Sequence, residues 1–207
     1  MVVWGIHTTM ATETRTATGI STVSSSEWVA GAVGGLVGSV FFGLMMQFAM
    51  PPPLPEMAIP PMYGIEGPAL AAGWALHLFH GVVLGFAYVA LVQFEPFRDP
   101  ARRLGGSLAL GVGYGVLTTA LLAVLVMPIW LSAVGFPAAP PFPNVAIPGT
   151  VLSLVGHVVH AIPVAVGHAL VSRKLQPAAS NRRTSRVPCG RAPGERRSSE
   201  RRPSTSI

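Results

Sequence analysis

Apolar residues along this chain gather into four long blocks instead of alternating with polar ones. The blocks cover residues 28–50, 69–94, 105–134 and 145–171, and none contains Asp, Glu, Lys or Arg. A helix needs about 20 consecutive, mostly apolar residues to cross the hydrocarbon core of a bilayer. A soluble helix of this composition would have no polar face for water. The pattern therefore predicts an all-α membrane protein with four transmembrane helices.

The segments outside these blocks are polar. We expect a disordered N-terminal tail over residues 1–27, a four-helix transmembrane domain over 28–172, and a disordered basic tail over 173–207, which is rich in Arg, Ser and Pro. Ten of the fourteen Lys and Arg residues lie within 172–207, so the net charge of +6 belongs to a tail and does not indicate nucleic-acid binding. The tail either binds anionic lipid headgroups or has no function.

Basic residues also predict an orientation. The loop between the second and third blocks holds three arginines, and the C-terminal tail begins with two basic residues. The proline-rich loops over 51–68 and 135–148 contain no Lys or Arg. Cytoplasmic loops carry an excess of Lys and Arg. We therefore expect a multi-pass protein of the cell membrane with both termini in the cytoplasm.

Two motifs indicate an internal repeat. His77-Leu78-Phe79-His80 in the second block recurs as His157-Val158-Val159-His160 in the fourth, and Met50-Pro51 recurs as Met127-Pro128. The chain thus resembles one two-helix unit written twice, which predicts two parallel-repeat helical hairpins. If the second and fourth helices meet at the symmetry axis, the four histidines converge.

Small residues spaced by four mark the faces on which these helices should pack. Such steps let two helix backbones approach closely, and residues four apart share a helix face. The predicted packing glycines are Gly34, Gly38, Gly81, Gly85, Gly111 and Gly115.

The histidine pairs allow several chemistries. Positions i and i+3 share a helix face, and imidazole binds transition metals and haem iron. The candidate metal or haem ligands are His77, His80, His157 and His160; a proton relay is also open. Hydrogen bonding between helices is the simpler interpretation and the one we favour, because the spans contain no carboxylate to orient a ligand imidazole. No cofactor is favoured. We expect His168 to lie at the inner interface.

Methionines cluster near the outer end of the first block. Thioether sulfur favours Cu(I), but methionine also fills irregular gaps in apolar packing, which is the interpretation we favour. The residues concerned are Met45, Met46, Met50, Met57 and Met62.

Five stretches together carry a resemblance to known proteins. They are Gly34-Gly35-Leu36-Val37-Gly38, Gly73-Trp74-Ala75-Leu76-His77-Leu78-Phe79-His80, Val126-Met127-Pro128-Ile129-Trp130-Leu131, Pro140-Pro141-Phe142-Pro143-Asn144 and Ser153-Leu154-Val155-Gly156-His157. Over residues 28–172 the chain resembles small four-helix haloarchaeal membrane proteins of unknown function, which are often catalogued automatically as "histidine kinase". The resemblance implies no established chemistry.

The sequence does not support the kinase label. It has no glycine-rich phosphate loop and no HATPase-like nucleotide site. The favoured function is a non-enzymatic membrane protein with a structural, sensory or partner-binding role, with the lipid bilayer as its partner. The alternatives are a redox protein that binds haem or a transition metal through the paired histidines, and a small transporter that would work as a homo-oligomer.

Overall fold

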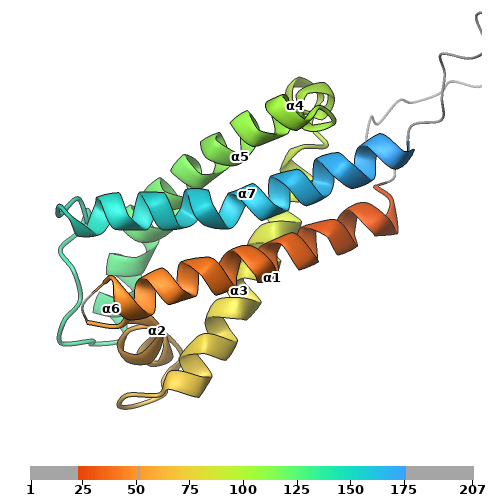
Figure 1. Ribbon diagram of the computed structural model, residues 1–207. Helices are drawn as coiled ribbons and strands as arrows, with labels where there is room; N and C mark the ends of the chain where they lie inside the picture. The colour runs from red at the N-terminus through yellow and green to blue at the C-terminus, as the bar shows by residue number, and fades with distance from the viewer. Residues whose placement is uncertain (1–22, 51, 176–207) are drawn as a thin grey trace, which may run out of the picture. The chain divides into compact units, whose positions relative to one another are not determined.

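The computed structural model describes residues 23–50 and 52–175, and this part of the chain is all-helical (Figure 1). Four of its helices are long and apolar enough to cross a membrane, as the hydropathy pattern predicts. The predicted tails lie almost entirely outside the described residues. The spanning helices are α1 (Ser25–Phe48), α3 (Leu70–Leu91), the continuous run Leu104–Ala133, and α7 (Gly149–Leu175).

The first helix begins at Ser25, three residues before its apolar block and inside the predicted N-terminal tail. The earlier start comes from a capping box, in which Ser24 accepts from the Glu27 backbone N–H and the Glu27 side chain accepts from the Ser24 backbone N–H. These two bonds satisfy groups that the helix itself leaves unpaired. At the other end of the domain, α7 continues to Leu175. The positive charges of Arg173 and Lys174 interact favourably with the negative end of its helix dipole.

The third spanning helix changes its winding midway. It passes from α5 (Leu104–Thr118) through a π-helix, η2 (Thr119–Val126), into α6 (Met127–Ala133). Pro128 has no N–H to give the Val124 carbonyl, and the Asn144 backbone N–H donates to that carbonyl instead, at 3.0 Å. The helix therefore continues through Pro128 without leaving a buried acceptor unpaired.

The first proline-rich loop is helical and not polyproline-like. It folds into α2 (Leu54–Met57) and a 3₁₀ turn, η1 (Pro60–Tyr63). Both have proline in the first turn, where the missing N–H costs nothing and the fixed φ suits a helix. Between α3 and α5, the loop forms a short helix, α4 (Glu95–Ala101), in which Arg98 pairs with Glu95 at 2.9 Å.

The first helix, α1, has the largest interhelical interfaces. It packs along α3 and, antiparallel, along α7, and α7 in turn packs on α5 (Figure 1). The second and fourth spanning helices, α3 and α7, contact each other only slightly. These two helices therefore meet over a small contact, and α1 supplies the larger surface that both of them share.

Glycines on two faces of α1 allow this double contact. A Cβ atom on Gly34 would lie 2.6 Å from Val164 Cα of α7, and one on Gly38 would lie 2.8 Å from His160 Cα. On the adjacent face, a Cβ on Gly31 would lie 2.9 Å from the Gly85 carbonyl oxygen of α3. Side chains at these positions would force the helix backbones apart.

The remaining predicted packing glycines also lie at helix contacts. A Cβ on Gly111 would lie 2.9 Å from Ala165 Cβ, and one on Gly115 would lie 2.7 Å from Val158 Cα, so both face α7. A Cβ on Gly81 would collide with the Ser39 side chain, and one on Gly85 with the Gly31 carbonyl.

Tyrosines join α3 and α5 in the half of the bundle nearer α4. Tyr88 is fully buried and its hydroxyl lies 3.1 Å from Ser107 Oγ, while Ser107 Oγ donates to the Ala165 carbonyl of α7 at 2.8 Å. Tyr114 donates from α5 to the Leu84 carbonyl of α3 at 2.8 Å. Each tyrosine hydroxyl therefore pairs with a group on another helix, as buried polar groups generally do.

Candidate functional site

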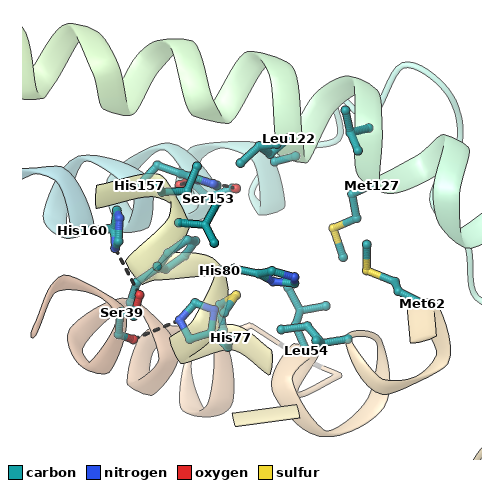
Figure 2. Close-up of a pocket in the computed structure, with 18 of the residues that line it drawn as sticks. Ser39, Leu54, Met62, His77, His80, Leu122, Met127, Ser153, His157 and His160 are labelled. Carbon is teal, nitrogen blue, oxygen red and sulfur yellow. Dashed lines mark hydrogen bonds between the residues drawn. The ribbon is translucent and has the colours of Figure 1, made fainter. Parts of the chain in front are cut away.

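A cavity of about 310 Å³ lies between α1, α3, η2 and α7, beneath the loop that contains α2 and η1 (Figure 2). All four histidines of the two predicted pairs line it, together with four methionines. Its walls are otherwise almost wholly apolar. The lining residues are Ser39, Phe42, Met46, Met50, Leu54, Ile59, Met62, His77, His80, Gly81, Val83, Leu84, Leu122, Ala123, Val126, Met127, Trp130, Ser153, His157 and His160.

Ser39 of α1 joins one histidine from each pair. His77 of α3 donates its Nε2–H to the Ser39 carbonyl at 2.9 Å, and His160 of α7 has its Nδ1 3.3 Å from Ser39 Oγ. Both bonds appear in Figure 2 as dashed lines that converge on Ser39. Ser39 is fully buried, and the bond with His160 Nδ1 is the side-chain hydrogen bond that its hydroxyl makes within the described residues.

Phe42, about one turn further along α1, lies between the imidazoles of His77 and His157. Its ring centroid lies 5.7 Å from that of His77 and 4.7 Å from that of His157. The edge of the ring fits against Gly156, where a Cβ would collide with it. His77, His157 and His160 thus each contact Ser39 or Phe42 of α1.

His157 is oriented by its own helix. Its Nδ1–H donates to the Ser153 carbonyl at 2.8 Å, one turn earlier in α7. That bond leaves Nε2 as the unprotonated nitrogen of the neutral ring. By the same argument, His77 donates through Nε2 and keeps a lone pair on Nδ1.

The end of the cavity nearest η1 is closed by contacts between α3, η1 and α6. The Tyr63 hydroxyl is hydrogen-bonded to His80 Nε2, and the Tyr63 ring lies 5.5 Å from that of Trp130. Trp130 Nε1–H donates to the Met62 carbonyl at 2.9 Å. Tyr63 lies in the loop outside the spanning helices, and burial raises the pKa of its hydroxyl above the usual value.

The arrangement of possible ligands bears differently on the metal hypothesis and on the haem hypothesis. Within residues 23–50 and 52–175, no group of three or more His, Cys, Asp or Glu side chains is placed to hold one metal ion. Haem needs only one or two axial ligands, so this finding leaves that hypothesis a prediction. Four thioethers share the cavity with the imidazoles, those of Met46, Met50, Met62 and Met127.

Ser39 and Phe42 are the main contributors to the site that the sequence analysis did not single out. A signal for Ser39 was present, because Gly31, Gly35 and Ser39 form a small-residue stripe at spacing four on the face of α1 toward α3. Phe42 lies among other apolar residues of the first block, and nothing in its spacing marks it as part of a site.

His168 was expected at the inner interface but is buried between helices. It is only 2% exposed, with Nε2 3.6 Å from Glu27 Oε1 and 3.4 Å from Ser172 Oγ. Ser172 Oγ also donates to Glu27 Oε1 at 2.8 Å. Glu27 therefore both caps α1 and ties it to the end of α7.

No family model, curated protein or solved structure matches this chain. The class that the fold defines is a multi-pass helical membrane protein, because four helices are long and apolar enough to span a bilayer.

Proposed function

We propose that this protein binds a lipid-soluble small molecule in the histidine-lined cavity and works without catalysis, as a membrane sensor or partner-binding protein. The observation that carries the proposal is the cavity itself, about 310 Å³ of space bounded by apolar side chains and four imidazoles. Binding pockets for small molecules are typically about 300–1,000 Å³, mostly apolar, and contain a few placed polar groups. The cavity has each of these properties.

The orientation is part of the proposal. The α4 loop carries Arg98, Arg102 and Arg103, whereas the loop containing α2 and η1 has no Lys or Arg. Because cytoplasmic loops carry an excess of basic residues, we place α4 and both termini on the cytoplasmic side of the cell membrane. The cavity then lies in the outer half of the bilayer. The proposed contact of the basic C-terminal tail with anionic headgroups falls outside the described residues.

Two copies of a helical hairpin account for the histidine pattern. In the proposal, α1 with α3 is one copy, and the run Leu104–Ala133 with α7 is the other. Support comes from the packing within each proposed copy, since α1 contacts α3 and α5 contacts α7. The histidine pairs occupy matching places on α3 and α7 and line the same cavity.

A second candidate is a redox protein with haem or a soft transition metal. It is favoured by the four imidazoles and four thioethers that line the same cavity, since both groups bind such metals. Purified protein would then show a Soret band or stoichiometric copper or iron. A colourless, metal-free protein would exclude this candidate and leave the first one standing.

The decisive experiment fills the cavity with a side chain. Ala123 of η2 lines the cavity, whereas Ala120 in the same π-helix is exposed on the outer surface. Native membranes containing wild type, Ala123→Phe and Ala120→Phe would be solubilised, and the co-purified small molecules measured by mass spectrometry. We expect one compound to be retained by wild type and Ala120→Phe but lost from Ala123→Phe. Equal content in all three proteins, with unchanged melting temperatures, would refute the proposal.

A further inference from the structure

We infer that the cavity selects a hydroxyl-bearing ring compound with an apolar tail, the chemistry of a reduced isoprenoid quinone. The inference rests on the proposed function and names the ligand class for the same cavity. It follows from three features: the direction of the hydrogen bonds around the imidazoles, the size of the cavity, and the residues at its side.

The hydrogen bonds leave acceptors rather than donors accessible in the cavity. His77 spends its one N–H on the Ser39 carbonyl, and His157 spends its own on the Ser153 carbonyl. His77 Nδ1 and His157 Nε2 therefore keep lone pairs, and neither atom is among the fully buried side-chain atoms of the described residues. A ligand in contact with them gains a hydrogen bond only if it donates one.

The other two imidazoles are bonded to residues of the protein. His80 pairs through Nε2 with the Tyr63 hydroxyl, and His160 pairs through Nδ1 with Ser39 Oγ while its Nε2 is fully buried with no hydrogen-bond partner in the described part of the chain. A carbonyl-only ligand, such as an oxidised quinone, would leave the lone pairs of His77 and His157 without a partner. A hydroxyl group instead matches the accessible lone pairs of His77 and His157.

The size of the cavity suits a substituted ring. A cavity of about 150 Å³ is enough to hold benzene, and the space here is about 310 Å³. Phe42 and Trp130 add aromatic surface to the walls, and aromatic rings pack favourably edge to face or offset. A ring with several small substituents would fill this volume, whereas the tail has to lie elsewhere.

A route for the tail lies between α3 and η2. These helices supply facing walls of the cavity, through Val83 and Leu84 on one side and Leu122 and Val126 on the other. They do not pack closely against one another. Val83 is 46% exposed and Val126 is 40% exposed, so both line the cavity and also reach the apolar outer surface. An apolar chain leaving here would enter lipid directly.

The test compares ligands that differ only in hydrogen bonding. Wild-type protein in lipid nanodiscs would be titrated with a decyl-tailed hydroquinone under reducing conditions, its dimethyl ether, and the corresponding quinone, with intrinsic tryptophan fluorescence as the readout and empty nanodiscs as the partition control. We expect the hydroquinone to bind about tenfold more tightly than the ether or the quinone. A straight-chain alcohol of similar length tests whether the ring is needed, and equal binding would assign the site to aliphatic alcohols and overturn the ring.

Variants of His157 test whether its imidazole accepts the hydrogen bond from the ligand hydroxyl. His157→Leu removes the acceptor and should abolish the preference for hydroquinone over its ether, whereas His157→Gln offers an amide oxygen and should keep part of it. Val155→Leu, on the exposed surface of the same helix, is the control that should leave both affinities unchanged.

The two proposals fail in different ways. If hydroquinone, ether and quinone bind equally but are all lost in Ala123→Phe, the cavity binds ligands without reading a hydroxyl, and the inference is wrong. If none binds wild type more tightly than Ala123→Phe, the proposed function fails as well. The ligand comparison uses wild-type protein, so it stands even if a His157 variant does not fold.

Discussion

Ser39 and His160 join α1 to α7 through their side chains, with Ser39 Oγ 3.3 Å from His160 Nδ1. The same serine accepts a hydrogen bond from His77 of α3 on its backbone carbonyl. Three helices therefore meet at one small residue that is completely buried. In an apolar environment, each of these bonds matters because no water can replace a lost partner.

Ser39→Ala should destabilise the bundle by about 0.5–2 kcal/mol, because His160 Nδ1 loses its partner while the carbonyl bond to His77 remains. Thermal unfolding in detergent would measure the loss. Ser132→Ala on exposed α6 surface is the control and should change the melting temperature little. A Ser39→Ala protein as stable as the control would show that this bond contributes nothing.

Gly38→Ala should cost about 1–3 kcal/mol, because the new Cβ would meet the His160 backbone, which cannot rotate away. Gly113 is the matched control, since a Cβ there meets nothing within 4 Å. Alanine is the better helix former by about 1 kcal/mol, so Gly113→Ala should be neutral or stabilising. Equal melting temperatures for the two variants would contradict the close approach of α1 and α7.

Tyr63 should make the outer end of the protein sensitive to alkaline pH. Burial raises the pKa of its hydroxyl in the folded state above the usual 10.0. An acid whose folded-state pKa is raised contributes stability below its unfolded pKa and loses it as pH rises through the folded pKa. Melting temperatures should therefore fall more steeply above about pH 10 for wild type than for Tyr63→Phe. The other tyrosines are common to both proteins, so parallel pH profiles would count against this role.

The orientation can be tested with the single cysteine, Cys189, in the predicted cytoplasmic tail. A membrane-impermeant thiol reagent should label it in inside-out vesicles and leave it unlabelled in intact cells. A Cys189→Ser protein that also carries Ala138→Cys, in the second proline-rich loop, should show the opposite pattern. Labelling of Cys189 in intact cells would reverse the proposed orientation.

Hydropathy alone was enough to predict four helices long and apolar enough to span a membrane. About twenty consecutive apolar residues without charges are more stable as a helix in a bilayer than exposed to water. The spacing of Gly34 and Gly38 likewise marked a face that packs on a helix. Spacing cannot say which helix lies opposite, so it did not show that α1 packs on both α3 and α7 and leaves them only a small contact with each other. That choice depends on the whole set of side chains, including Phe42, whose ring lies between His77 and His157.

The course of the helices at their prolines also could not be predicted from the pattern of apolar blocks. A helix can continue past a proline such as Pro128 when another group pairs with the released carbonyl, as Asn144 does for Val124. The prolines of the first proline-rich loop begin short helices. In both places the outcome depends on a hydrogen-bond partner distant in sequence or on the turn that follows.

The glycine faces of α1 also bear on how the protein is assembled during synthesis. Membrane helices insert individually and pack afterwards. Among the described spans α1 is made first, yet Gly34 and Gly38 fit against α7, which is made last of the four. The face of α1 toward α3 can pack as soon as α3 is inserted, whereas the face that carries Gly34 and Gly38 stays in contact with lipid until α7 has entered the membrane.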